Sequence, residues 1–276
     1  MNIKIIADSS SNLHRVEGNM VTTVPLKILT DEREFCDDAS LNVEEMVSYM
    51  QHYSGRSGTS CPNVGDWLDA FGDAETVFTV SITSGLSGCY NAARQAARVY
   101  LDEHPERKVC CLDTLSTGPE MVLIVEKLQE LIAQGLSFEK IKKMIHSYMQ
   151  TTHLLFMLER MENLANNGRV SPLIAKAAGL LGIRVVGSAS DKGTLHQEHK
   201  CRGEKKALTT MLKCMTERGY EGGKVRIAHC SNVKGALEMS ALIRELYPQA
   251  DVVISDCGGL CSFYAEQGGL LLGYEA

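Results

Sequence analysis

Hydroxyl side chains and glycines share the segment 83–88, which reads T-S-G-L-S-G. The segment follows an apolar run typical of a buried strand and precedes a stretch with helical spacing. Glycines let backbone N–H groups approach a ligand, and a helix N-terminus carries partial positive charge. Ser84, Ser87 and the backbone of Gly88 are therefore predicted to hold a carboxylate or a phosphate. A tight strand-to-helix turn with capping serines explains the same residues without a ligand.

A second hydroxyl-rich segment, 58–62 (G-T-S-C-P), also leads into an expected helix. It brings Thr59 and Ser60 in front of Pro62, although small polar residues and proline are expected at any helix N-terminus. Two such helix starts in one α/β domain favour a ligand site, because doubly wound sheets bind ligands at the ends of their strands.

Arg169 follows N-N-G in an otherwise apolar region. A guanidinium group there could bind a carboxylate through two parallel hydrogen bonds. The alternative is a helix C-terminus, with Asn167 or Gly168 in a left-handed conformation and Arg169 in solvent.

Several catalytic and metal-binding patterns are missing from the sequence. Residue 89 is cysteine where the hydrolase pattern G-x-S-x-G needs glycine, and neither G-x-x-x-x-G-K-[ST] nor G-x-G-x-x-G occurs. His196, His199 and Cys201 have the spacing H-x-x-H-x-C, which matches no standard zinc pattern, so we predict no metal site there and expect polar residues between a strand and a helix.

The composition is that of an ordinary globular protein. Of 276 residues, 44% are hydrophobic and 22% are charged, and the net charge of −6 argues against a nucleic-acid partner. No apolar run is long enough for a membrane span, and no secretory signal precedes the first strand. Ten cysteines without a C-x-x-C pair then indicate a reduced, cytoplasmic protein.

The elements that must position these residues alternate between strand-like and helical patterns, which predicts an α/β protein with mainly parallel sheets. Strands are expected at 3–7, 21–28, 76–82, 108–112, 153–158, 183–187, 225–229, 252–254 and 268–274. Helices are expected after Asn42 and Asn63 and at 92–99, 121–132, 138–149, 204–217 and 235–247. The length suits two domains, which we place at 1–150 and 151–276.

Five segments, in order, resemble those of the DegV family of fatty-acid-binding proteins. They are D-S-S-S-N-L at 8–13, T-S-C-P-N at 59–63, S-G-L-S-G-C at 84–89, N-G-R at 167–169 and K-C-R-G-E-K-K-A at 200–207. The corresponding family patterns are D-S-x-x-D-L, T-S-Q-P-S, S-x-L-S-G-T, G-G-R and K-x-R-G-x-K-K-A. Cys61 and Cys89 thus stand where the family patterns have glutamine and threonine.

The resemblance implies an N-terminal Rossmann-like domain with a mainly parallel sheet, a second α/β domain, and an acyl tunnel between them. A long-chain fatty acid would be bound there, with no metal and no other cofactor. Its carboxylate would be held by Thr59, Ser87 and the N–H of Gly88, with Ser60 and Ser84 as neighbours. Such a protein binds lipid and is not itself an enzyme.

The resemblance also implies a partner, since some relatives present the fatty acid to a separate kinase that phosphorylates the carboxylate for phospholipid synthesis. An arginine and a histidine assist there. Arg169 fills the first position, but the family's H-x-G-P-G aligns with D-C-G-G-L at 256–260, so Asp256 replaces the histidine. An ionised aspartate would repel a carboxylate, so Asp256 either points elsewhere or pairs with Arg169.

Two other functions stay open on the residues alone. One is an independent enzyme that acts on a small acidic or phosphorylated substrate at the same loops. The other is a sensor that uses a lipid only to order its domains.

Overall fold

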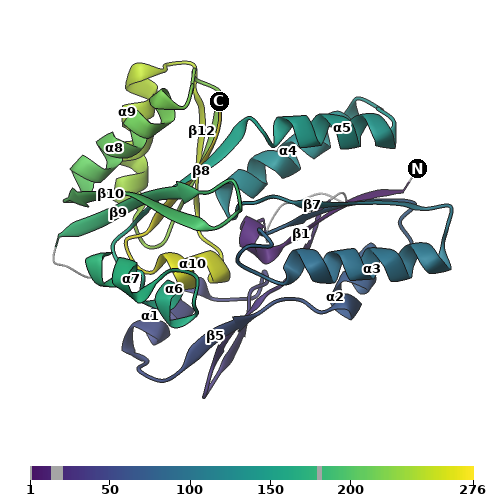
Figure 1. Cartoon of the computed structure of the whole chain (residues 1–276), viewed down its shortest axis with the longest axis horizontal. Coiled ribbons are helices and arrows are strands. Elements are labelled where there is room, and N and C mark those ends of the chain that lie inside the picture. The colour runs from purple at the N-terminus through teal and green to yellow at the C-terminus, as the bar shows by residue number, and fades with distance from the viewer. Residues whose placement is uncertain (1, 14–20, 179–181) are drawn as a thin grey trace.

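The computed structural model describes residues 2–13, 21–178 and 182–276, arranged as two lobes (Figure 1). The N-terminal lobe is built on a parallel sheet in the order β2-β1-β6-β7. Its strands are β1 (Ile3–Asp8), β2 (Val21–Val24), β6 (Thr76–Ser81) and β7 (Lys108–Asp113). All six residues of β6 are buried, which is expected of a strand covered on both faces.

Four helices complete the core of this lobe, with α2 and α3 on one side of the sheet and α4 and α5 on the other (Figure 1). They are α2 (Val64–Phe71), α3 (Cys89–Glu103), α4 (Pro119–Ala133) and α5 (Phe138–Tyr148). The start of α2 is fixed by a capping box, in which Asn63 and Asp66 each accept the other's backbone N–H.

A small antiparallel sheet, in the order β4-β3-β5, projects from the N-terminal lobe beside α1 (Val43–His52). Its strands are β3 (Lys27–Thr30), β4 (Glu34–Cys36) and β5 (Ser57–Ser60). The single strand predicted at 21–28 was wrong, because Pro25 has no N–H with which to continue a ladder. The chain leaves the parallel sheet after Val24, and the N–H of Leu26 bonds instead to Ser9 Oγ at 3.0 Å.

The C-terminal lobe holds a six-stranded mixed sheet, in the order β10-β9-β8-β13-β11-β12. The strands are β8 (Thr152–Leu158), β9 (Ile183–Ala189), β10 (Leu195–Arg202), β11 (Lys224–His229), β12 (Asp251–Asp256) and β13 (Leu270–Glu275). Only β11 and β12 pair in parallel, so the expectation of mainly parallel sheets holds for the first lobe and not for the second. Residues 196–201, expected as polar residues between a strand and a helix, form most of β10, whose position at the edge of the sheet leaves polar side chains in solvent.

Helices α8 (Glu204–Glu217) and α9 (Val233–Leu246) pack on this sheet, while the short helices α6 (Glu162–Asn166), α7 (Pro172–Ala178) and α10 (Gly259–Ala265) lie toward the small sheet (Figure 1). Helix α4 contacts strands of both main sheets and so lies between the lobes. Helix α10 is held against the N-terminal lobe, since the N–H groups of Gly259 and Leu260 donate to the Asp37 carboxylate at 2.6 and 3.0 Å. The domain limits at 150 and 151 stay a prediction.

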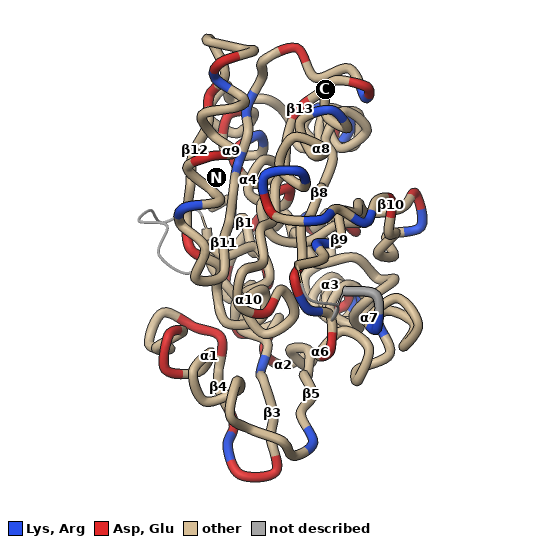
Figure 2. Tube along the Cα trace, turned by 90° about the vertical axis from the view of Figure 1, so that its left-hand side faces the viewer, with Lys and Arg blue, Asp and Glu red and all other residues tan. Residues whose placement is uncertain are grey.

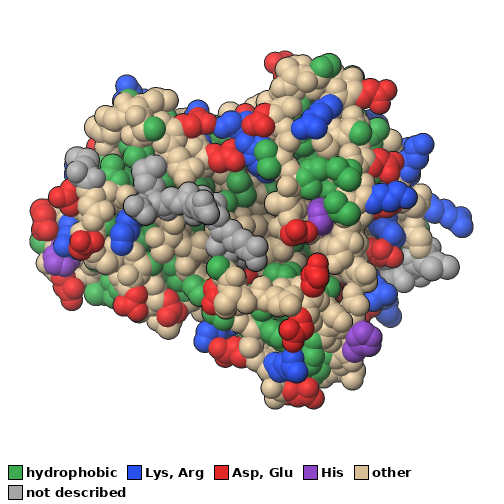
Figure 3. Space-filling view, turned by 180° about the vertical axis from the view of Figure 1, so that it is seen from behind, with side chains coloured by type: hydrophobic (Ala, Val, Ile, Leu, Met, Phe, Trp, Pro, Cys, Tyr) green, Lys and Arg blue, Asp and Glu red, His purple; other side chains and the backbone are tan. Residues whose placement is uncertain are grey.

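Acidic and basic residues are interspersed along the trace (Figure 2), and acidic, basic and apolar groups intermix on the rear face (Figure 3). Among the described helices, none has the length and apolar character that crossing a lipid bilayer requires.

Candidate functional site

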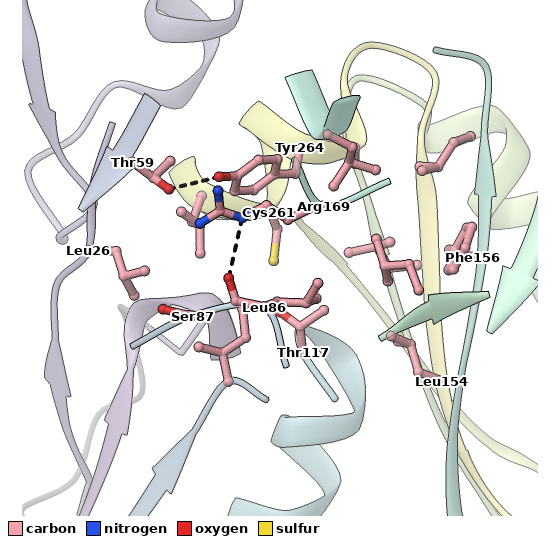
Figure 4. A pocket seen from close by; sticks show the side chains of 17 residues that line it. Leu26, Thr59, Leu86, Ser87, Thr117, Leu154, Phe156, Arg169, Cys261 and Tyr264 are labelled. Carbon is pink, nitrogen blue, oxygen red and sulfur yellow. Dashed lines mark hydrogen bonds between the residues drawn. The ribbon is translucent and has the colours of Figure 1, made fainter. Parts of the chain in front are cut away.

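A cavity lies where the two lobes and the small sheet meet (Figure 4). The cavity volume is about 70 Å³, and all the space between its walls, including the open mouth, is about 670 Å³. Its lining comprises Leu26, Thr59, Ile82, Leu86, Ser87, Thr117, Leu154, Phe156, Leu158, Leu164, Arg169, Leu195, Leu260, Cys261, Tyr264, Ala265 and Leu271. Most of these side chains are apolar, and hydrogen-bonding groups are few.

The polar groups gather at one end of the cavity (Figure 4). There the hydroxyl groups of Thr59 and Tyr264 lie 2.8 Å apart, and Arg169 Nε donates to the carbonyl oxygen of Leu86 at 3.3 Å. Ser87 lines the same end. Hydroxyl donors and a guanidinium group around one space could hold a carboxylate or another small anion.

The apolar end is built mainly by β8. Leu154, Phe156 and Leu158 alternate along the strand, so all three point to the cavity, while Leu155 and Met157 point into the core on the other face of the sheet. Leu154 and Phe156 lie at the end of the cavity opposite Thr59 in Figure 4. The cavity therefore runs from a hydrogen-bonding end to a hydrocarbon end.

Strand alternation also separates two neighbouring predicted site residues, Thr59 and Ser60. Both belong to β5, where Thr59 pairs with Ile28 and Ser60 pairs with Lys27. Successive side chains of a strand point to opposite faces, so Thr59 reaches the cavity and Ser60 is absent from its lining.

The predicted segment 83–88 contains both a tight turn and a residue that faces the cavity. Thr83 is buried and its Oγ1 accepts the N–H of Gly85 at 3.0 Å, as in a tight turn, while the exposed Ser84 uses its N–H to bond Asp113. Ser87 faces the cavity, and its hydroxyl currently donates to Cys89 Sγ at 3.2 Å. Gly88 forms the N-cap of α3 outside the cavity lining.

Arg169 combines the two predicted alternatives. Gly168 has φ +73° just after α6, which is the left-handed helix end expected there. The Arg169 side chain nevertheless turns inward, where it bonds the carbonyl oxygens of Leu86 and Asn167. Thr59, Ser87 and Arg169, from three distant segments, thus line one space.

Asp256 lies apart from these residues. Its side chain is 88% exposed at the end of β12, with Oδ1 3.4 Å from His229 Nδ1. It lines a different hollow, together with Asn12 and Cys257. Of the two arrangements considered for Asp256, the structure has the one in which it points away from Arg169.

Tyr264 is the site residue that the sequence did not reveal. It comes from α10, and burial raises the pKa of its phenol, so it remains a neutral hydrogen-bonding group. The preceding G-G-L-C-S segment has no helical apolar spacing and two glycines, which gave no reason to expect a helix there.

Potential metal-ligating groups occur at one place in the described residues, where ligand atoms of Glu198, His199 and Cys214 lie within 4.8 Å of one another. Glu198 is ion-paired with Arg218, and burial raises the pKa of the Cys214 thiol. A cation would have to displace Arg218 and deprotonate Cys214, so this group is poorly suited to hold one.

Comparison with known proteins identifies relatives along the whole chain. The model of a family described as "uncharacterised protein, DegV family" matches residues 2–275. A DegV domain-containing protein of Streptococcus pneumoniae is 44% identical over 100% of this chain and 99% of its own length.

Two solved structures are similar over the same extent. A DegV family protein from Eubacterium eligens, loaded with heptadecanoic acid, is 46% identical with a TM-score of 0.97, covering 99% of each chain. The fatty acid kinase B3 protein of Streptococcus pneumoniae, loaded with linoleic acid, is 44% identical with a TM-score of 0.97, covering 100% of this chain and 99% of that one. The predicted α/β fold with two lobes is confirmed, and the chain belongs to the DegV family.

Proposed function

We propose that this chain binds one long-chain fatty acid in the cavity between its lobes. The carboxylate would lie among Thr59, Ser87 and Arg169, and the acyl chain would run past Leu154 and Phe156. The observation that carries the proposal is the division of one cavity into a hydrogen-bonding end and a hydrocarbon end. The two solved relatives described as loaded with fatty acids support it.

The physical chemistry of such a ligand suits this division. Each CH₂ group taken from water contributes about 0.8 kcal/mol, so a long chain supplies most of the affinity. A carboxylate loses its hydration on entry, and hydrogen bonds to a charged group recover about 1.5–3 kcal/mol each. Thr59, Ser87 and Arg169 line the polar end of the cavity and carry donors for such bonds.

We further propose that the protein presents the bound carboxylate to a fatty acid kinase and has no catalytic machinery or cofactor of its own. Arg169 would assist in that transfer, since its guanidinium group lies at the polar end of the cavity. The role assigned to Asp256 remains a prediction of the family pattern. Ser60, Ser84 and Gly88 were predicted as ligand contacts, but none of the three lines the cavity, so the proposal assigns the carboxylate no contact with these residues. Ten free cysteines support a cytoplasmic site of action.

The proposal predicts that Thr59→Ala combined with Ser87→Ala weakens fatty-acid binding. Two hydrogen bonds to a carboxylate are lost, and at about 1.5–3 kcal/mol each the dissociation constant should rise at least ~100-fold. Displacement of a fluorescent long-chain fatty acid measures the affinity, and circular dichroism checks that the helical content is unchanged.

Ser60→Ala is the matched control, because it removes a hydroxyl one residue from Thr59 on the opposite face of β5. Its affinity should stay within about twofold of the wild type. Equal affinity in the wild type and the double variant would place the carboxylate elsewhere. A phosphoryl or acyl ester hydrolysed by the wild type but not by Ser87→Ala would favour an enzyme instead.

A further inference from the structure

Two cysteines from different segments meet beside the polar end of the cavity. Cys61 precedes α2 and Cys89 opens α3, and the Cys61 sulfur lies against Gly88, the residue directly before Cys89. Each lies two residues from a cavity hydroxyl, Thr59 in the first case and Ser87 in the second. Both cysteines are departures from the patterns T-S-Q-P-S and S-x-L-S-G-T.

The backbone at residue 88 is shaped to admit the Cys61 sulfur. A Cβ atom at Gly88 would lie only 3.1 Å from Cys61 Sγ, so a side chain there would press against the sulfur. The backbone N–H groups of Cys61 and Gly88 help to lower the pKa of the Cys61 thiol at the N-terminal end of α3. A helix N-terminus and donated N–H groups stabilise a thiolate over a thiol.

The two sulfurs differ in their exposure to solvent. All ten cysteines belong to the described part of the chain, and among them Cys61 is the exposed one. Cys89 is buried beside the Asp8 carboxyl group. The hydrogen bond from Cys89 lowers the pKa of Cys61 to about 6, and the same bond, together with burial, raises the pKa of Cys89. Burial also raises the pKa of Cys257 and Cys261.

We propose that Cys61 and Cys89 form an oxidisable dithiol, a modification site that reacts with peroxides. The Cys61 thiolate attacks one oxygen of hydrogen peroxide, the O–O bond breaks, and sulfenic acid and hydroxide are formed, the latter taking up a proton to become water. The Cys89 sulfur then attacks the sulfenic sulfur and expels a second water, which carries the Cys89 proton. Overall, two thiols and one peroxide give one disulfide and two waters.

This chemistry is independent of the proposed lipid ligand and can be tested on the reduced, full-length protein. Hydrogen peroxide is added in steps at pH 7, and the remaining thiols are blocked with N-ethylmaleimide. Trypsin would leave both cysteines on one peptide, because no Lys or Arg separates Arg56 from Arg94, so a protease that cleaves before Asp is used. Asp66, Asp69 and Asp73 lie between the two cysteines.

The expected product is a cross-linked pair of peptides that lacks the mass of two hydrogen atoms. It should form at peroxide doses at which the partly buried Cys36 is still a reduced thiol and is blocked by N-ethylmaleimide. In Cys89→Ser the reaction should stop at a Cys61 sulfenic acid, which dimedone traps. Cys61→Ser should leave Cys89 reduced, and the control Cys36→Ser should behave as the wild type.

The rate of alkylation provides a second readout that does not need the disulfide. A pKa near 6 instead of 9 gives roughly 90-fold more thiolate at pH 7, partly offset by a roughly 20-fold lower nucleophilicity. Cys61 should therefore react a few-fold faster than an ordinary thiol, with a pH midpoint near 6. The proposal would be overturned if N-ethylmaleimide blocked Cys61 as fully after peroxide treatment as before it. It would also be overturned if the pH midpoint of Cys61 alkylation lay near 9.

Discussion

Asp8 is a carboxyl group enclosed by the N-terminal sheet. It is 0% exposed and accepts the N–H groups of Ile82 and Ser10 at 2.7 and 3.1 Å. Burial outweighs these bonds and raises its pKa from 3.8 to about 6. The folded state therefore holds the Asp8 proton more tightly than the unfolded state does. The protonated carboxyl group stabilises the fold fully below pH 3.8, and this stabilisation is lost as the pH rises through about 6.

Asp8→Asn should remove that pH dependence while keeping an oxygen to accept from Ile82. Relative to the variant, the free energy of unfolding of the wild type should fall by up to about 3 kcal/mol between pH 3.5 and pH 7. Urea unfolding at several pH values measures the difference, with the exposed Asp102→Asn as control. Parallel pH curves for wild type and Asp8→Asn would contradict the burial argument.

At the residue scale, the sequence identified site residues whose side chains carry hydrogen-bonding or charged groups. Hydroxyl and guanidinium groups near glycine suggested anion binding, the DegV resemblance then singled out Thr59, Ser87 and Arg169, and all three line the cavity. Which of two adjacent residues faces it could not be predicted at 59–60, since S-G-T-S has no apolar alternation. Tyr264 was missed because its position depends on packing between distant segments.

At the element scale, helices and strands with strong periodicity or caps were predicted well. The capping box of α2 and the predicted 204–217 helix match the structure. The small sheet was missed because β4 has only three residues and β5 reads S-G-T-S, so no local apolar alternation marks them. Pairing between distant segments, which sequence periodicity does not encode, decides such strands.

The contact between α4 and β13 yields a prediction at this scale. A Cβ atom at Gly273 would lie 2.5 Å from the backbone nitrogen of Glu120, so the helix touches the strand at a residue without a side chain. Gly273→Ala must push the two elements apart and should destabilise the protein by about 1–3 kcal/mol.

Chemical unfolding gives this loss, and Gly58→Ala provides the comparison, since its added Cβ would meet Asn167 Oδ1 only at 3.5 Å. Equal stability of Gly273→Ala and Gly58→Ala would mean that α4 and β13 are not packed this tightly.

At the scale of the whole molecule, α4 joins the lobes through charge as well as packing. Arg226 of β11 is nearly buried and binds both carboxylate oxygens of Glu126 on α4, at 2.7 and 2.8 Å. Glu126→Gln would leave Asp251 as the carboxylate paired with the guanidinium group and should lower the free energy of unfolding by about 1–3 kcal/mol.

Thermal or urea unfolding tests this, with Glu217→Gln in the exposed Lys213–Glu217 pair as control, for which a change within about 0.5 kcal/mol is expected. A Glu126→Gln variant as stable as the control would show that the inter-lobe pair contributes nothing.

Two lobes could be anticipated from length and from alternating elements, but the space between them could not. The cavity wall combines β5, the 83–88 loop, β8 and α10, which are far apart in the chain. Apolar residues that line a cavity and those that fill a core have the same periodicity, so only the fold distinguishes Phe156 from Leu155.

The most direct test of the fatty-acid proposal is to count the lipid on the protein. Freshly purified chain would be denatured, its lipid extracted, and the fatty acids quantified by mass spectrometry against the protein concentration. We predict close to one long-chain fatty acid per chain, and clearly less on the Thr59→Ala, Ser87→Ala double variant. Protein that carries no fatty acid and takes up none when a long-chain fatty acid is added would contradict the account.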